Sequence, residues 1–83
     1  MSEIPPPALE DLQLDCLGKA CPVPVIELAK AVAAMAVDDV VTVLADDPGA
    51  KVDIPVWCRM KHQELVDVSD EGSILRFTVR KLA

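Results

Sequence analysis

Aromatic side chains are nearly absent from this 83-residue chain, which has one Trp, one Phe and no Tyr. Its core must therefore be aliphatic and closely packed, built from the abundant Val, Leu, Ala and Ile. A chain of this length buries about 60 to 65% of the surface that its unfolded form exposes. It has room for one core and not for a second.

Basic residues are also scarce, since eight Lys and Arg face fourteen Asp and Glu, for a formal net charge of −6. This charge repels nucleic-acid phosphates and anionic lipids, which argues against direct DNA binding. Residues 1–10 lack the basic and apolar regions of an export signal. No apolar run approaches the ~20 residues that span a bilayer. We therefore expect a soluble, cytoplasmic protein without membrane association, and a monomer on grounds of size and charge.

The chain has only three cysteines, Cys16, Cys21 and Cys58. An odd number in a short chain without an export signal argues against a disulfide framework. Metal binding, catalysis and simple burial remain as explanations for them.

Residues 1–8 contain three consecutive prolines and little that can pack, which predicts an extended, poorly ordered tail. Residues 9–83 are predicted to form a single domain. At its start Leu12, Leu14 and Cys16 alternate with polar residues, the pattern of a strand with one buried face.

The next segment has apolar residues at helical spacing from Val25 to Met35, which predicts a helix ending near Ala36. Pro22 and Pro24 fall in its first turn, where backbone N–H groups have no partner within the helix. Proline is therefore tolerated at both positions.

A β-branched run over residues 40–45 predicts a central strand, and turn residues at 46–49 end it. Strand, helix and strand in this order imply a right-handed parallel crossover. Asp53 is the predicted N-cap of a second helix that runs to about Lys61, with Pro55 in its first turn.

Residues 65–69 and 74–81 have the pattern of two strands joined by a turn at 70–72, a hairpin. The predicted order is therefore βαβαββ. This order describes an α+β two-layer sandwich, with a four-stranded mixed sheet and both helices packed on one face. The other face of the sheet is expected to be largely solvated.

Cys21 is the leading candidate for chemistry. Gly18 allows a sharp turn out of the first strand, and Pro22 at the first helical position puts Cys21 at or beside the N-cap. Its sulfur then faces the free N–H groups of the first turn, whose partial positive charge favours the thiolate and lowers the pKa. Lys19 is expected to add to this effect, while Pro22 and Pro24 each remove one donor. The alternative is that Cys21 is an ordinary small apolar residue before a helix.

The residues around Cys21 also resemble a known family. The pattern Leu14-Asp15, Gly18 and Cys21-Pro22-x-Pro24 is similar to the signature of the TusA (SirA-like) sulfur-carrier family. The similarity extends to the end of the chain through Asp46-Asp47-Pro48, Asp53-Ile54-Pro55, Trp57-Cys58 and Glu64-Leu65.

This resemblance implies the same βαβαββ sandwich and a function for Cys21. In the family the matching cysteine accepts sulfane sulfur as a persulfide and hands it on. The donor is a cysteine desulfurase or a rhodanese, and the acceptors serve tRNA thiolation, molybdenum-cofactor sulfuration or sulfur oxidation. Pro22 and Pro24 shape the helix start. The resemblance implies a carrier without a bound cofactor or metal, of the sulfurtransferase type, and not a stand-alone turnover enzyme.

One position departs from the family pattern. Similar proteins often have Gly-His before the third strand, where this chain has His62 and Gln63. Glycine there suits a left-handed turn, and histidine adopts positive φ more readily than most residues. The fold is therefore expected to survive with some local strain.

Two other readings of the cysteines stay open. Cys16 or Cys58 could form a reversible disulfide with Cys21, which would make the domain a thiol-based redox or regulatory module. We favour burial for both, because free cysteine is among the most buried residue types. Cys16, Cys21, Cys58 and His62 are also conceivable zinc ligands, but a C-x4-C spacing is not the usual zinc knuckle. The basic residues of the last strand, Arg76, Arg80 and Lys81, are expected to form a solvated face.

Overall fold

The computed structural model describes residues 12–83. The predicted tail, residues 1–8, and the first three residues of the predicted domain lie outside this range. The described elements are β1 (Leu12–Cys16), α1 (Val23–Ala34), β2 (Val40–Ala45), α2 (Ala50–Met60), β3 (Glu64–Glu71) and β4 (Ile74–Arg80). Their order, βαβαββ, confirms the prediction.

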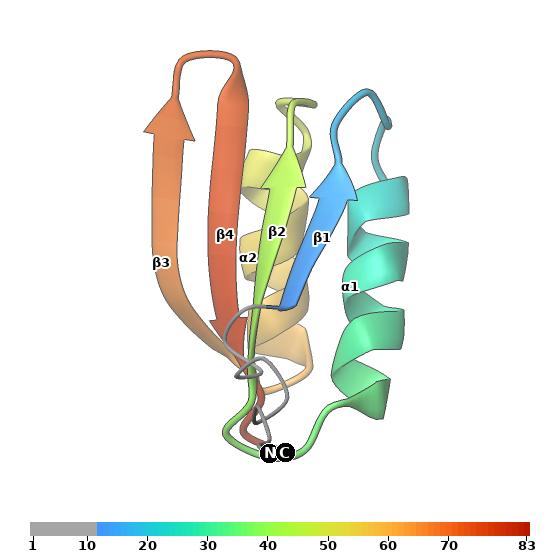
Figure 1. Cartoon of the computed structure of the whole chain (residues 1–83), viewed down its shortest axis with the longest axis vertical. Helices are drawn as coiled ribbons and strands as arrows, with labels where there is room; N and C mark the ends of the chain where they lie inside the picture. Colours follow the sequence, from blue (N-terminus) through green and yellow to red (C-terminus); the bar gives the residue numbers. More distant parts are fainter. Residues whose placement is uncertain (1–11) are drawn as a thin grey trace, which may run out of the picture.

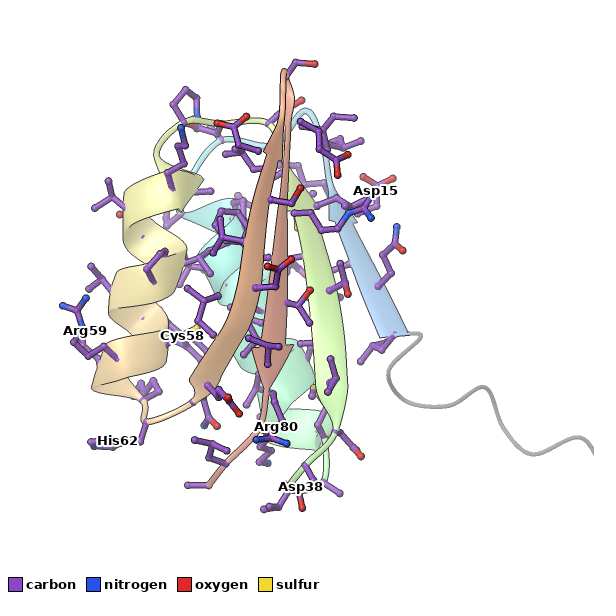
Figure 2. All side chains as sticks on the ribbon, turned by 90° about the vertical axis from the view of Figure 1, so that its left-hand side faces the viewer. Asp15, Asp38, Cys58, Arg59, His62 and Arg80 are labelled. Atoms are coloured by element: carbon purple, nitrogen blue, oxygen red, sulfur yellow. The ribbon has the colours of Figure 1, made fainter. Side chains whose placement is uncertain are left out.

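The four strands form one mixed sheet in the order β1-β2-β4-β3 (Figure 1). β1 and β2 are parallel, and β4 is antiparallel to both of its neighbours. α1 and α2 pack on the same face, so the domain has two layers (Figures 1 and 2). The predicted two-layer α+β sandwich is confirmed. No helix over residues 12–83 is long and apolar enough to cross a membrane.

The core lies between the sheet and the two helices. Alternate residues of the central strands face it, among them Val41 and Val43 of β2 and Phe77 and Val79 of β4, all with no exposed surface. The helices contribute one stripe each, and within residues 12–83 no polar or charged side chain is buried. Phe77, the one phenylalanine, is the largest fully buried side chain of this otherwise aliphatic core.

The predicted start of α2 is wrong. The helix begins at Ala50 and not after Asp53, because the chain is already turned by Asp47, whose side chain and carbonyl accept from the N–H groups of Gly49 and Ala50 at 2.8 and 2.9 Å. Asp53 is therefore inside the helix. Pro55 is the sixth helical residue, where its missing N–H leaves one carbonyl of the first turn without its usual partner.

The end of α2 confirms the expectation for His62. Its φ is +58°, in the left-handed region. The N–H groups of His62 and Gln63 donate back to the carbonyls of Arg59 and Cys58, at 3.4 and 2.9 Å. This pair of hydrogen bonds is typical of a Schellman motif. Histidine thus occupies the position for which glycine is the usual choice.

Lys81 does not belong to a solvated face as predicted. It is partly buried, and its Nζ donates to the carbonyl oxygens of Val32 and Met35 at 2.9 and 2.8 Å. These carbonyls end α1, whose last turn has no basic residue of its own. A side chain 46 residues away along the chain therefore caps this helix.

Candidate functional site

One end of the domain collects three loops that are far apart in the sequence. β1 and β2 are parallel, so the loops that follow them, residues 17–22 and 46–49, leave the sheet at the same edge. The turn between β3 and β4 reaches this end as well, at the top of Figure 1. The N-termini of α1 and α2 both start here, and we call this the site end.

Cys21 lies in the loop between β1 and α1, directly before Pro22, the N-cap residue of α1. It is partly exposed and also packs against the core. Gly18 turns the chain out of β1 with a φ of +78°, as predicted. Pro24 is buried in the first turn, and Pro22 is exposed. Pro22 is thus the N-cap and not, as predicted, the first helical residue, which is Val23. Cys21 lies beside the N-cap, in the strand-to-helix loop where it was expected.

Asp47 joins the two strand-to-helix loops. Its Oδ1 accepts from the N–H of Gly49 at 2.8 Å, and its Oδ2 accepts from the N–H of Cys21 at 2.9 Å. These two hydrogen bonds lower the pKa of Asp47 below its ordinary value, so it is ionised at neutral pH. Asp46 makes a parallel contact, because its Oδ2 accepts from the N–H of Gly18 at 2.9 Å.

Gly49 leaves room beside the sulfur. A Cβ atom at this position would lie 3.5 Å from the Cβ and 3.7 Å from the Sγ of Cys21. It would also lie 3.3 Å from Oδ1 of Asp47. Because Gly49 has no side chain, the backbone at the start of α2 lies close to Cys21.

The predicted low pKa of Cys21 is wrong. Partial burial raises the pKa of this thiol above its ordinary value, and its hydrogen bond to the carboxylate of Asp53 raises it further. The negative charges of Asp53 and Asp47 act in the same direction, and Cys16 adds to them. At rest Cys21 is therefore a thiol and not a thiolate.

The helix start cannot offset these carboxylates because it has few free donors. Pro22 and Pro24 have no N–H group. The N–H of Val23 donates to the carbonyl of Ala20 at 3.0 Å, and the N–H of Cys21 itself is taken by Asp47. The partial positive charge of a helix terminus is located on unsatisfied N–H groups, and most of them are missing or occupied here.

Lys19 does not have the predicted effect on Cys21 either. Its charge lowers the pKa of Cys16, where burial and the charge of Glu27 act more strongly in the opposite direction. The pKa of Cys21 is raised by burial and by the carboxylates of Asp53 and Asp47, and Lys19 is not among the residues that shift it.

The predicted burial of the other two cysteines is confirmed. Cys16 is 1% exposed and Cys58 is 2% exposed, and all three cysteines are free thiols. Burial raises the pKa of Cys58 to about 11. Cys58 is on α2 eight residues beyond Ala50, which at 1.5 Å per residue puts it about 12 Å down the helix from the site end (Figure 2).

The four conceivable zinc ligands are not brought together. Cys16 and Cys21 are at the site end, whereas Cys58 and His62 are near the opposite end of α2 (Figure 2). Over residues 12–83 there is no group of three or more His, Cys, Asp or Glu side chains arranged to hold a metal ion.

Two open depressions mark the surface beside Cys21. One of about 400 Å³ is lined by Gly18, Lys19, Ala20, Asp46, Asp47 and Pro48. The other, of about 440 Å³, shares Asp46 and Pro48 with the first and extends to the β3–β4 turn. The surface between the three loops is therefore hollowed, and three carboxylates, of Asp46, Asp47 and Asp70, line it together with Lys19 and Lys51.

Three residues around the sulfur, Asp47, Gly49 and Asp53, are not predicted site residues. Asp47 and Asp53 carry a signal, because Asp46-Asp47-Pro48 and Asp53-Ile54-Pro55 are part of the family pattern. The local sequence indicates only a turn and an N-cap at these positions, because nothing local connects them to Cys21. Only the parallel pairing of β1 with β2 does so.

Comparisons with known proteins identify the family of this chain and agree with its fold. The family model described as "Sulfurtransferase TusA" matches residues 12–81. A protein from Archaeoglobus fulgidus named "Putative sulfur carrier protein" is 44% identical over 69 residues, which are 82% of this chain and 90% of that protein. "Putative sulfur carrier protein YrkI" from Bacillus subtilis is 37% identical over 71 residues, 86% of this chain and 95% of that one.

A solved structure shows the same fold. The crystal structure of the SirA-like protein from Desulfitobacterium hafniense superposes with a TM-score of 0.75 at 24% sequence identity. The match covers 87% of this chain and 99% of that one.

Proposed function

The chain belongs to the TusA family, and on this premise we propose that it is a sulfur carrier that accepts sulfane sulfur on Cys21 as a persulfide and hands it to an acceptor protein. The observation that carries the proposal is the difference between the three thiols. Cys21 is partly exposed in a loop at the site end, while Cys16 and Cys58 are sealed in the core. A carrier needs a sulfur that two other proteins can reach in turn.

The transfer consists of exchange reactions at sulfur. The Cys21 thiolate attacks the outer sulfur of a donor persulfide, the S–S bond of the donor breaks, and a new S–S bond forms on Cys21. The donor cysteine leaves as a thiolate and takes up the proton that Cys21 released, so no oxidant or reductant is consumed. The acceptor then repeats the step with its own thiolate, and Cys21 returns to the thiol.

The raised pKa of Cys21 has a consequence for this function. A thiol that is protonated at rest reacts slowly with oxidants and with free disulfides, because the thiolate is the nucleophile. Transfer then depends on a docked partner that brings Cys21 into its reactive form. The unloaded carrier is thereby protected from side reactions until a partner docks.

We propose a cysteine desulfurase or a rhodanese as the donor, with acceptors that act in tRNA thiolation, molybdenum-cofactor sulfuration or sulfur oxidation. The carrier itself is proposed to be a cytoplasmic monomer. Its contacts with each partner are transient, because the sulfur must be released again.

The test is to incubate the protein with a cysteine desulfurase and cysteine and to determine its intact mass. We expect one added sulfur, about 32 Da, on the wild-type chain and on Cys16→Ala and Cys58→Ala. We expect none on Cys21→Ala. Sulfur on Cys21→Ala would contradict the proposal. A loss of two mass units on mild oxidation, without any gain of sulfur, would instead favour the redox module in which Cys21 pairs with Cys16 or Cys58.

A further inference from the structure

Two carboxylates of α2 and the loop before it flank the sulfur of Cys21. Asp53 is exposed on α2, one helical turn after Gly49, and its N–H donates to the Gly49 carbonyl at 2.9 Å. A Cβ atom on Gly49 would lie 3.7 Å from the Cys21 sulfur, so this face of α2 is next to the sulfur, and the Asp53 carboxylate raises the pKa of the Cys21 thiol. Asp47, six residues earlier, holds the Cys21 backbone N–H at 2.9 Å. Both negative charges therefore face whatever approaches this sulfur from outside.

No cation of the described chain neutralises this pair. All eight Lys and Arg residues are within residues 12–83, and none of them forms an ion pair with Asp47 or Asp53. The nearest basic residue of α2, Lys51, is paired with Asp70 of the hairpin at 2.9 Å. Lys19 lines the adjacent depression, but Asp46 and Asp47 line it as well and outnumber it. The approach to Cys21 therefore has a net negative charge.

The proposed sulfur transfer is the basis for the next step. We infer that Asp53, together with Asp47, selects the partners of Cys21 by charge: it favours a protein that presents a Lys or Arg beside its own reactive cysteine. It disfavours a partner whose reactive cysteine has acidic neighbours. Asp53 is the specificity-determining residue of the two, because it is exposed at the sulfur, whereas both oxygens of Asp47 are occupied by backbone N–H groups.

The physical reason is Coulombic and has two parts. A cation docked against Asp53 is attracted at short range, and acidic neighbours of a wrong partner are repelled. The same cation also offsets the charge that disfavours the Cys21 thiolate, so the correct partner increases the reactive form of the nucleophile as it binds. Recognition and activation would thus be one event.

Small disulfides of different charge test this without a partner protein. Cys21 attacks one sulfur of the reagent, the S–S bond breaks, a mixed disulfide forms, and the other half leaves as a thiol. We would compare dicationic cystamine, neutral 2-hydroxyethyl disulfide and dianionic dithiodipropionate, each rate divided by that of N-acetylcysteine amide. At 0.01 M salt we expect the wild type to prefer cystamine over the neutral reagent by about threefold or more. The anionic reagent should be slowest. In 1 M salt, where the Debye length is about 3 Å, the preference should largely disappear.

The variants assign the effect to a residue. Asp53→Asn should reduce the cystamine preference at least twofold at low salt, while Asp53→Glu should retain it. Asp38→Asn is the matched control, because it removes the same charge at the opposite end of the domain (Figure 2), and asparagine tolerates its φ of +78°. An unchanged preference in Asp53→Asn, or an equal loss in Asp38→Asn, would overturn the inference.

Loading with a cysteine desulfurase separates this inference from the proposed function. If the wild type accepts no sulfur, the carrier proposal fails, whichever disulfide reagent the protein prefers. Should both the wild type and Asp53→Asn accept sulfur on Cys21 while their reagent preferences are the same, only the selection by charge fails.

Discussion

The two ends of this domain are stabilised by different kinds of side-chain hydrogen bond: side chains accept at one end and donate at the other. At the site end, short carboxylates accept from backbone N–H groups: Asp46 from Gly18, and Asp47 from Cys21 and Gly49. At the opposite end, the long side chain of Lys81 donates to the carbonyls that end α1. Except for the local Asp47–Gly49 contact, the hydrogen bonds of both sets join residues separated by at least 26 positions in the sequence.

This difference follows from the direction of the helices. α1 and α2 both start at the site end, where backbone N–H groups have no partner within the helix, and both finish at the other end, where carbonyls have none. Acceptors therefore suit one end and donors the other, in agreement with the helix dipoles. The negative charge near Cys21 is therefore partly a structural requirement, and the nucleophile has to react beside it.

The largest expected effect concerns pH and the site end. Because burial and the neighbouring carboxylates raise the pKa of Cys21, its thiolate fraction should increase about tenfold from pH 7 to pH 8 and continue to increase up to pH 9. The rate of alkylation of Cys21 by iodoacetamide, followed by peptide mass spectrometry, should increase in parallel. A plateau below pH 8 would show that a helix-stabilised thiolate exists after all.

A second prediction removes the contact between the two loops. Asp47→Ala loses both hydrogen bonds and should slow sulfur acceptance from a cysteine desulfurase by about tenfold or more, because small displacements of a reacting group are costly. It should also lower the urea midpoint. The loss of negative charge favours the thiolate, but we expect the displacement to dominate.

Asp46→Ala is the control for that experiment. It removes one hydrogen bond, to Gly18, and leaves the backbone of Cys21 held. Its sulfur acceptance should stay closer to that of the wild type. Equal rates for Asp47→Ala and the wild type would show that the contact between the loops does not position the sulfur.

The smallest effect on transfer is expected at the opposite end. Lys81→Met keeps the length of the side chain but loses two charge-assisted hydrogen bonds to the end of α1, so the free energy of unfolding should fall by about 1 to 3 kcal/mol. Urea unfolding measures this. Sulfur acceptance by the folded variant should remain within about twofold. A strong loss of sulfur acceptance with an unchanged free energy of unfolding would contradict this, because it would show that Lys81 affects the reaction at Cys21 from the opposite end of the domain.

Much of the architecture could be predicted from the sequence. Period-two and helical spacings indicated all six elements, and the side-chain parity of β1 predicted that Cys16 faces the core. The left-handed conformation of His62 was also predictable, because it replaces a glycine of the family pattern. The start of α2 differs from the prediction by four residues, because Asp47, and not Asp53, turns the chain into the helix.

The order of the elements, the aliphatic core and the position of Cys21 in a strand-to-helix loop depend on local residue patterns, so they could be predicted without a structure. The protonation state of Cys21 depends instead on contacts between distant segments. Packing partly buries its thiol, and the parallel pairing of β1 and β2 brings Asp47 and Asp53, 26 and 32 positions further along the chain, close to it. Burial and these charges raise the pKa, and the helix start, which two prolines have deprived of donors, does not offset them. The sign of a pKa shift depends on such neighbours in space, which local spacing does not encode.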